Sequence, residues 1–384
     1  MYIYILILVL ALAGAFLLKQ GSTKSTVFLV CWLATLALFV GFSDMLGGYD
    51  RYIYGELFDE VADVRRAGGE IQSAYIFELY SSEFGFSWLN VAISYITANR
   101  YIFILILTIV IYSLLFISFK KYVDNYPFAL VLFLGLIFFF TFTYLRQLIG
   151  VGVGWLSIEY VYKKKFWKFL VVVLLATLIH NSAIILLPVY FLPIKQYSKR
   201  AVTVLMVFCF VLGITGIPSA MFDIYGSVTE MEGRGQNYAE NEVGFKIEYI
   251  LEAFFFLYFI FRNYDKVPKT PARIVMMNMA LLFCAVLLIF SRSLNGGRLG
   301  WYYLIGMIST LSLIVPNAKR IRGQYLVLAI FSCFLYLRIL LFAWGPLGTL
   351  YPYKSFFTNG VRKGDWVHDK WEYDQDYDRD KFYR

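Results

Sequence analysis

Long apolar runs separated by short polar segments extend from the first residues of the chain to about residue 344. Several runs are long enough for a helix that crosses the hydrocarbon core of a bilayer, which needs about 20 apolar residues. A transmembrane barrel would instead show segments of about ten residues with alternating apolar and polar side chains, and these runs do not alternate. The pattern predicts an all-α, polytopic integral membrane protein.

The apolar runs predict about twelve transmembrane helices, within a range of about 10 to 13. They cover residues 2–18, 27–42, 101–119, 128–145, 147–162, 166–180, 182–194, 201–217, 247–262, 274–290, 300–315 and 324–344. We expect residues 1–350 to form a single transmembrane domain and residues 351–384 to form a polar C-terminal tail. Residues 88–98 are apolar but too short to cross, so they predict an interfacial or re-entrant helix. If they do cross, the topology after them inverts.

Charge supports this topology. The chain is 60% hydrophobic and only 16% charged, which excludes an ordinary soluble domain. Its net charge of +9 comes mainly from short clusters between the apolar runs. Such clusters mark cytoplasmic loops, so we place them in the cytoplasm and do not expect nucleic-acid binding. The clusters are Lys19/Lys24, Lys120/Lys121, Lys163/Lys164/Lys165/Lys168, Lys195/Lys199/Arg200, Lys266/Lys269/Arg273 and Lys319/Arg320/Arg322.

Two longer polar segments face outward in this topology, at about residues 43–100 and 218–246, and both carry many carboxylates. Neither contains a Walker loop or a strand-borne G-x-G-x-x-G pattern, so we do not expect a nucleotide to supply energy. The two histidines, His180 and His368, lack a second His or Cys at zinc-ligand spacing. The sequence therefore predicts no metal site and no cofactor.

The candidate chemistry lies between residues 141 and 193. Arg146 and Gln147 open one apolar segment, and His180 interrupts another. Residues 166–193 are only just long enough for two crossings, and we place the turn between them at residues 180–182. A charged side chain at membrane depth costs about 2.5 to 3.5 kcal/mol on insertion scales, so Arg146 is a candidate for function.

Short motifs along the chain carry a family resemblance. Residues 144–152 read YLRQLIGVG, and residues 178–183 read LIHNSA. Shorter elements flank them: Gly48-Tyr49-Asp50 with Tyr54, Glu83-Phe84-Gly85-Phe86, Gly297-Arg298-Leu299 with Tyr302-Tyr303, and Pro352-Tyr353 with Phe356. Together these motifs resemble those of the EpsG-like, Wzy-type polysaccharide polymerases. One departure is Tyr49, because the family usually has Thr at this position. This difference weakens the case for a phosphate-binding role of the first outer loop.

The resemblance implies an enzyme of the bacterial inner membrane that acts at its outer face. It implies transfer of a growing glycan from a polyprenyl diphosphate carrier to a hydroxyl of the next lipid-linked repeat unit. The implied partners are the polyprenyl-diphosphate-linked donor and acceptor, membrane lipid, a chain-length regulator and a flippase. The reaction needs cations at the diphosphate, a base for the acceptor's proton and a groove for the isoprenoid.

Each candidate residue has a functional and a structural interpretation. Arg146 and Arg298 suit a diphosphate because a guanidinium donates bidentately, but each can also snorkel or pair with a loop carboxylate. His180 suits a general base, but it can also hydrogen-bond a backbone carbonyl to hold a broken helix. We assign catalysis to Arg146, His180 and Asp50, and substrate binding to Arg298, Gln147, Tyr54 and Glu83. Asp50 and Glu83 are rival bases, and both can equally be solvated loop charges.

Two other classes of function share this chemistry. One is a different membrane glycosyltransferase or ligase with a polyprenyl-linked donor, which would transfer the glycan to another acceptor. The other is a transporter of lipid-linked sugars, for which internal repeats are expected. The two halves of the chain show no convincing repeat, and the long acidic outer segments favour a catalytic surface.

Overall fold

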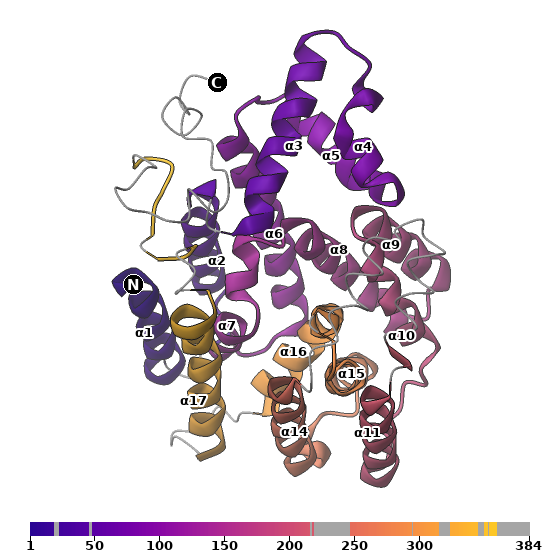
Figure 1. The fold of residues 1–384 in the computed structure, drawn as a ribbon. Coiled ribbons are helices and arrows are strands. Elements are labelled where there is room, and N and C mark those ends of the chain that lie inside the picture. The colour runs from indigo at the N-terminus through magenta and orange to yellow at the C-terminus, as the bar shows by residue number, and fades with distance from the viewer. Residues whose placement is uncertain are drawn as a thin grey trace.

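The computed structural model describes residues 1–18, 23–45, 48–215, 217–218, 246–293, 295–314, 323–344, 349–351 and 353–358. These residues form 15 α-helices, joined in places by short 3-10 turns (Figure 1). An isolated bridge between Ser43 and Ser355 is the β pairing found in the described part of the chain. The all-α class predicted from the sequence is confirmed.

Most helices coincide with the predicted apolar runs. In the first half these are α1 (Tyr2–Leu17), α2 (Thr26–Gly41), α6 (Arg100–Tyr122), α7 (Tyr126–Leu136), α8 (Leu145–Tyr162) and α9 (Phe166–Ile179). In the second half they are α11 (Lys199–Ile214), α14 (Ile247–Arg262), α15 (Pro271–Ile289), α16 (Leu304–Ile314) and α17 (Gly323–Arg338). Within the described ranges, α6, α15 and the segment Gly323–Ala343 are long and apolar enough to cross a membrane. Several shorter helices are also apolar, which indicates a multi-pass membrane protein.

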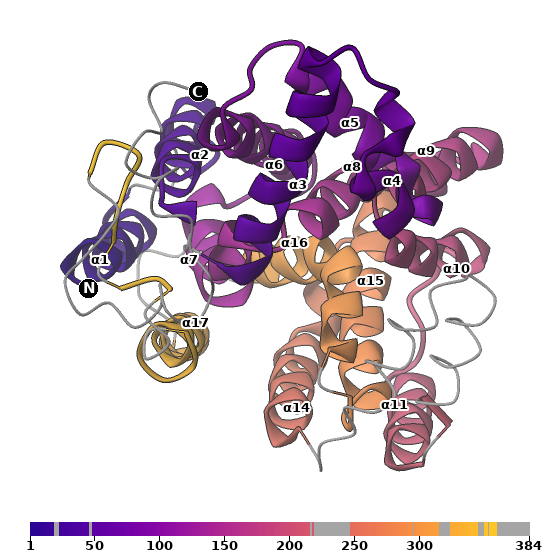
Figure 2. The ribbon, with the colours of Figure 1, turned by 45° about the horizontal axis from the view of Figure 1, so that its top comes forward.

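Helices distant in sequence pack side by side. Helix α7 contacts both α1 and α17. The phenol of Tyr325 donates to the Ala15 carbonyl at 2.6 Å, and that of Tyr336 donates to the Tyr4 carbonyl at 2.9 Å. The first and last long helices of the described chain therefore lie antiparallel beside each other (Figure 2).

Three of the predicted spans are interrupted rather than continuous. Residues 128–145 divide into α7 and the 3-10 turn η5 (Phe138–Phe142), and residues 300–315 divide between η8 (Gly296–Tyr303) and α16. Residues 182–194 form only η6 (Asn181–Leu186) and α10 (Leu187–Phe191), with Pro188 at the start of the latter. In η5 the Thr141 hydroxyl donates to the Phe138 carbonyl at 2.6 Å. This bond competes with the backbone hydrogen bonds of an α-helix. The number of crossings stays a prediction.

The predicted outer segment at residues 43–100 is mostly helical. It forms α3 (Tyr49–Arg66), η3 (Ile71–Ser73), α4 (Tyr75–Leu79), η4 (Ser81–Glu83) and α5 (Phe84–Ser94). We call α3, α4 and α5 the cap. Tyr54, Phe58 and Val61 are buried at helical spacing along one side of α3, which explains why this charged segment folds. The cap lies at the top of Figure 1, next to α8 and α9.

The helix predicted at residues 88–98 is present as α5, displaced by a few residues toward the N-terminus. Its placement relative to a membrane stays a prediction. The second predicted outer segment, at residues 218–246, lies outside the described residues apart from its two ends. Most of the predicted C-terminal tail, including His368, also lies outside the described residues.

Described residues of several basic clusters lie at the opposite end of the helices. Lys24 pairs with Asp124 at 2.7 Å, Arg273 also pairs with Asp124, and Lys121 pairs with Glu159. These contacts join the ends of α6 and α8 to the starts of α2 and α15. Helix α6 has 23 residues and rises about 34 Å, so it separates this basic face from the cap. Arg100, at its first residue, donates from Nε to Asp59 of α3 at 2.7 Å.

Arg51 anchors the cap to the transmembrane helices. Its side chain is completely buried and donates to the carbonyls of Ser43, Gly41 and Phe142 at 2.9, 3.2 and 3.4 Å. Burial lowers the pKa of Arg51 to about 10, so the guanidinium stays charged at neutral pH. One side chain thus satisfies backbone acceptors at the end of α2, before α3 and in η5.

The beginning of the predicted polar tail packs beside this anchor. The Asp44 amide donates to the Lys354 carbonyl at 3.1 Å, and the Phe356 amide donates to the Phe42 carbonyl at 2.7 Å. The Tyr353 ring stacks on Phe39 with 4.4 Å between centroids. The described residues 353–358 therefore belong to the packed structure rather than to a solvated tail.

Arg51→Met should destabilise the protein, because it leaves three buried carbonyls without their donor. Each unsatisfied buried polar group costs about 1 to 3 kcal/mol, so we expect a loss of about 3 kcal/mol or more in unfolding free energy. The thermal midpoint of the detergent-purified protein measures the effect. Arg66→Met is the matched control, because Arg66 is exposed on the same helix. Equal midpoints for the two variants would contradict the anchoring role.

Candidate functional site

The centre of the candidate site is a buried ion pair between α8 and the cap. Arg146 is the second residue of α8 and is 7% exposed. Its guanidinium pairs with the carboxylate of Glu83, which ends η4 and is 2% exposed. Burial of two charges is costly, and the energy is recovered only when the pair is close and further hydrogen-bonded.

The Glu83 carboxylate has such a second bond. Its Oε1 accepts the backbone N–H of Asn181 at 2.8 Å, and the Asn181 side chain donates to Ser82 Oγ at 2.8 Å. Asn181 follows the extended residue His180, where α9 ends. One carboxylate therefore holds together the start of α8, the cap and the helix break at residue 180.

Aromatic rings complete the surroundings of Arg146. The guanidinium lies over the Tyr80 ring, 4.1 Å from its centroid, and it also interacts with the Tyr54 phenol. Burial raises the pKa of the Tyr54 phenol above its ordinary value, so the hydroxyl stays protonated. The Arg146 Nε is buried without a hydrogen-bond acceptor among the described residues. Arg146 thus keeps a donor in a site of low polarity.

His180 begins a chain of hydrogen bonds at the helix break. Its Nδ1 lies 2.6 Å from Ser182 Oγ, and this oxygen lies 3.0 Å from the Tyr302 hydroxyl of η8. A Cβ at Gly150 would lie only 3.1 Å from the His180 Cβ and 3.4 Å from the Tyr302 hydroxyl. Gly150, one helical turn after Arg146, therefore lets α8 approach His180 closely.

A second cation lies on the other side of the start of α8. The Gln147 amide donates to the Arg298 carbonyl at 3.3 Å, and the Arg298 guanidinium lies 4.7 Å from the centroid of the Tyr144 ring. A Cβ at Gly297 would lie 2.5 Å from the Tyr249 ring of α14, so a larger residue there would have to displace that ring. Two consecutive residues of α8 thus contact different segments: Arg146 contacts Glu83 of the cap, and Gln147 contacts Arg298 of η8.

The structure brings most of the predicted site residues together. Arg146, Glu83 and Tyr54 form one cluster, His180 adjoins it through Asn181, and Gln147 links it to Arg298. Asp50 lies in the first turn of α3, where its amide donates to Thr143 Oγ1 at 3.2 Å. Of the two interpretations of Arg146, the structure shows the pairing with a loop carboxylate. Glu83 is that partner rather than a solvated loop charge.

Three contributors to the site were not among the predicted site residues. Tyr80 lies three residues before Glu83 and has no charge or spacing that marks it. Ser182 and Tyr302 lie within the family-like motifs, and the fully buried Tyr302 phenol is hydrogen-bonded to Ser182. In the described part of the chain, no group of three or more His, Cys, Asp or Glu side chains is placed to hold a metal ion.

These features define a helical membrane protein with a buried, charged site at the cap end of its helices. The family model of the EpsG family matches residues 26–355, which is most of the chain. The protein therefore belongs to the EpsG family, which is associated with exopolysaccharide biosynthesis. No curated protein and no solved structure matches the chain.

Glu83→Gln should destabilise the protein strongly, because it leaves the Arg146 charge buried without its counter-ion. The expected loss is about 3 to 5 kcal/mol of unfolding free energy, measured by denaturation in detergent. Glu78→Gln is the control, because Glu78 is exposed in the same segment. The double variant Glu83→Gln/Arg146→Gln should lose less than the sum of the single losses. Strict additivity would show that the two side chains do not act as a pair.

Proposed function

We propose that this protein polymerises polyprenyl-diphosphate-linked oligosaccharide repeat units into a surface polysaccharide at the outer face of the bacterial inner membrane. One observation carries the proposal: Arg146, Glu83 and the His180 segment, from three separate parts of the chain, converge at the cap end of the helices. Lys24 and Lys121, which belong to basic clusters predicted to be cytoplasmic, lie at the opposite end. Membership of the EpsG family supports the same assignment.

Arg146 would stabilise the leaving group. A hydroxyl of the acceptor attacks the anomeric carbon of the donor, and the bond from that carbon to the diphosphate oxygen breaks. The electron pair leaves with the diphosphate, so negative charge grows where a fixed guanidinium stabilises it most. The buried Nε of Arg146 is the donor that the ion pair with Glu83 leaves available. The Arg298 guanidinium, which lies over the Tyr144 ring, supplies a second positive charge near the cap end of the helices.

His180 would take the proton that the acceptor hydroxyl loses. In one arrangement of the hydrogen bonds, His180 Nδ1–H donates to Ser182 and Ser182 donates to Tyr302. This tautomer leaves Nε2 with a lone pair, as a general base requires. Glu83 is less suited to this role, because both of its oxygens are already engaged by Arg146 and Asn181. Asp50, half-exposed at the start of α3, is the rival base.

The decisive test uses a host that lacks this protein but makes the cognate lipid-linked repeat unit. Wild type should restore a ladder of long polysaccharide chains, whereas Arg146→Ala should reduce polymerisation about 100-fold or more, leaving single repeats. Arg66→Ala, an exposed cation of the cap, is the control, and immunoblots of membranes establish equal protein levels. Arg146→Lys should restore little activity, because an ammonium lacks the bidentate fork.

Other outcomes would assign another function. If single repeats do not reach the outer face without the protein, it is a transporter. If polymer length is unaffected but the glycan is not attached to its final acceptor, it is a ligase. A normal ladder from well-expressed Arg146→Ala and His180→Ala variants would remove both residues from the mechanism.

The hydrogen bond between His180 and Ser182 should orient the imidazole for the reaction. Ser182→Ala removes this bond, so the maximal rate should fall about tenfold because the ring is less well oriented. Membrane vesicles supplied with lipid-linked repeats allow this measurement. The control is Ser157→Ala, which removes a buried hydroxyl of α8 bonded only to Gly154 in the described structure. A maximal rate equal to that of the control would exclude the orienting role of Ser182.

A further inference from the structure

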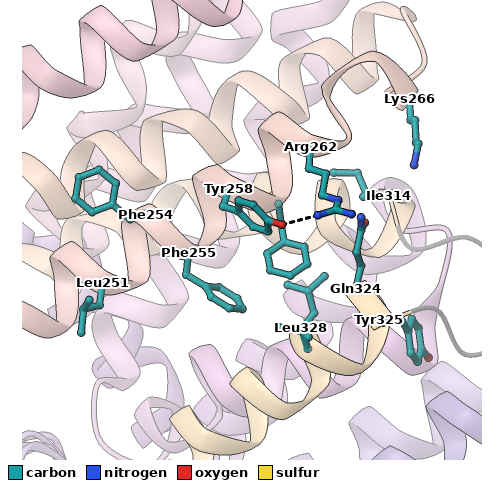
Figure 3. A pocket seen from close by; sticks show the side chains of 13 residues that line it. Leu251, Phe254, Phe255, Tyr258, Arg262, Lys266, Ile314, Gln324, Tyr325 and Leu328 are labelled. Carbon is teal, nitrogen blue, oxygen red and sulfur yellow. Dashed lines mark hydrogen bonds between the residues drawn. The ribbon is translucent and has the colours of Figure 1, made fainter.

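A long groove lies between α14 and α17, with a volume of about 790 Å³ (Figure 3). Aromatic side chains of α14 form one wall, among them Phe254 and Tyr258, which are 52% and 54% exposed. Val327 of α17, 46% exposed, lines the facing wall. Between the helices Phe255 stacks on Phe331, with 3.8 Å between ring centroids. The groove is therefore apolar, and the stacked rings of Phe255 and Phe331 fill the space between the two helices at its base.

Both charged side chains that line the groove are cations, and both lie at one end. Arg262 is the last residue of α14, and it donates to the Tyr258 hydroxyl at 2.6 Å (Figure 3). Lys266 follows in η7 (Tyr264–Lys266), where its ammonium donates to Asn263 Oδ1 at 3.0 Å. Among the described residues, neither cation is paired with a carboxylate, and no carboxylate lines the groove. This end of the groove is suited to an anion.

The dimensions match one leaflet of a bilayer. From Leu251 to Arg262 the helix rises about 16 Å, and half of a hydrocarbon core is about 15 Å thick. Arg262 and Lys266 are at the same end of the helices as Arg273, opposite the cap and the candidate site. The groove is therefore separate from the site proposed for the polymerisation reaction.

We infer that this groove binds an anionic phospholipid from the leaflet on the basic face. One acyl chain lies along the aromatic wall between Leu251 and Tyr258, and the phosphate contacts Arg262 and Lys266. Anionic lipid is favoured over zwitterionic lipid because two cations and no carboxylate are among the described lining residues. This binding does not depend on the enzymatic proposal.

Native mass spectrometry of the purified protein tests the headgroup contact. The probes are phosphatidylglycerol and phosphatidylcholine with identical acyl chains. Phosphatidylglycerol should bind more tightly, and Arg262→Gln/Lys266→Gln should weaken it about 10- to 30-fold, since each cation near the surface contributes about 1 kcal/mol. The control is Lys165→Gln/Lys168→Gln, which removes two exposed cations of the basic face outside the groove. Equal affinity for the two lipids, or equal losses in the two double variants, would overturn the inference.

A second pair of variants tests the acyl chain. Val327→Trp should obstruct the groove and weaken phosphatidylglycerol binding while Arg262 and Lys266 remain. Ile330→Trp is the control, because Ile330 is exposed on α17 but does not line the groove. Thermal midpoints of both variants show whether the fold is retained. If Val327→Trp binds the lipid as tightly as Ile330→Trp does, the groove does not hold the chain.

Discussion

The buried ion pair between Arg146 and Glu83 joins the cap to the start of α8. Glu83 belongs to the cap, Arg146 to the start of α8, and the carboxylate also holds the residue after the break in α9. An arginine buried at the end of a membrane helix is tolerated only with such a partner. The position of the cap, the start of α8 and the orientation of His180 are therefore mutually dependent.

The same pair suggests how the site is prepared for a charged substrate. A guanidinium held by a carboxylate and an aromatic ring keeps its orientation before the substrate arrives, so little reorganisation is needed when charge develops. Both arginines of the candidate site lie over tyrosine rings, Arg146 over Tyr80 and Arg298 over Tyr144. Aromatic residues abundant in this sequence thus orient cations as well as fill the core.

Much of the fold was predictable, because apolar composition and run length alone locate most of the helices. The sequence indicated the break at residues 180–182 but not two others. Residues 128–145 and 300–315 are as apolar as neighbouring spans, yet η5 and η8 interrupt them. In η8, Gly297 lies against the Tyr249 ring of α14, a contact that the local sequence does not show. Helices α3 and α4 of the cap were also not predicted, because the many charged residues of this segment obscure the buried side of α3.

For the site, the sequence by itself determined which residues are candidates, because a charge or an imidazole within an apolar run has few structural explanations. Side-chain chemistry within apolar runs selected Arg146, Gln147 and His180, and the family resemblance of its motif selected Arg298. Only the tertiary structure decided their partners. Glu83 lies 63 positions before Arg146 in the chain and looks like any other loop carboxylate until the cap folds onto α8. An ion pair depends on distance and burial, and neither property is contained in a local stretch of sequence.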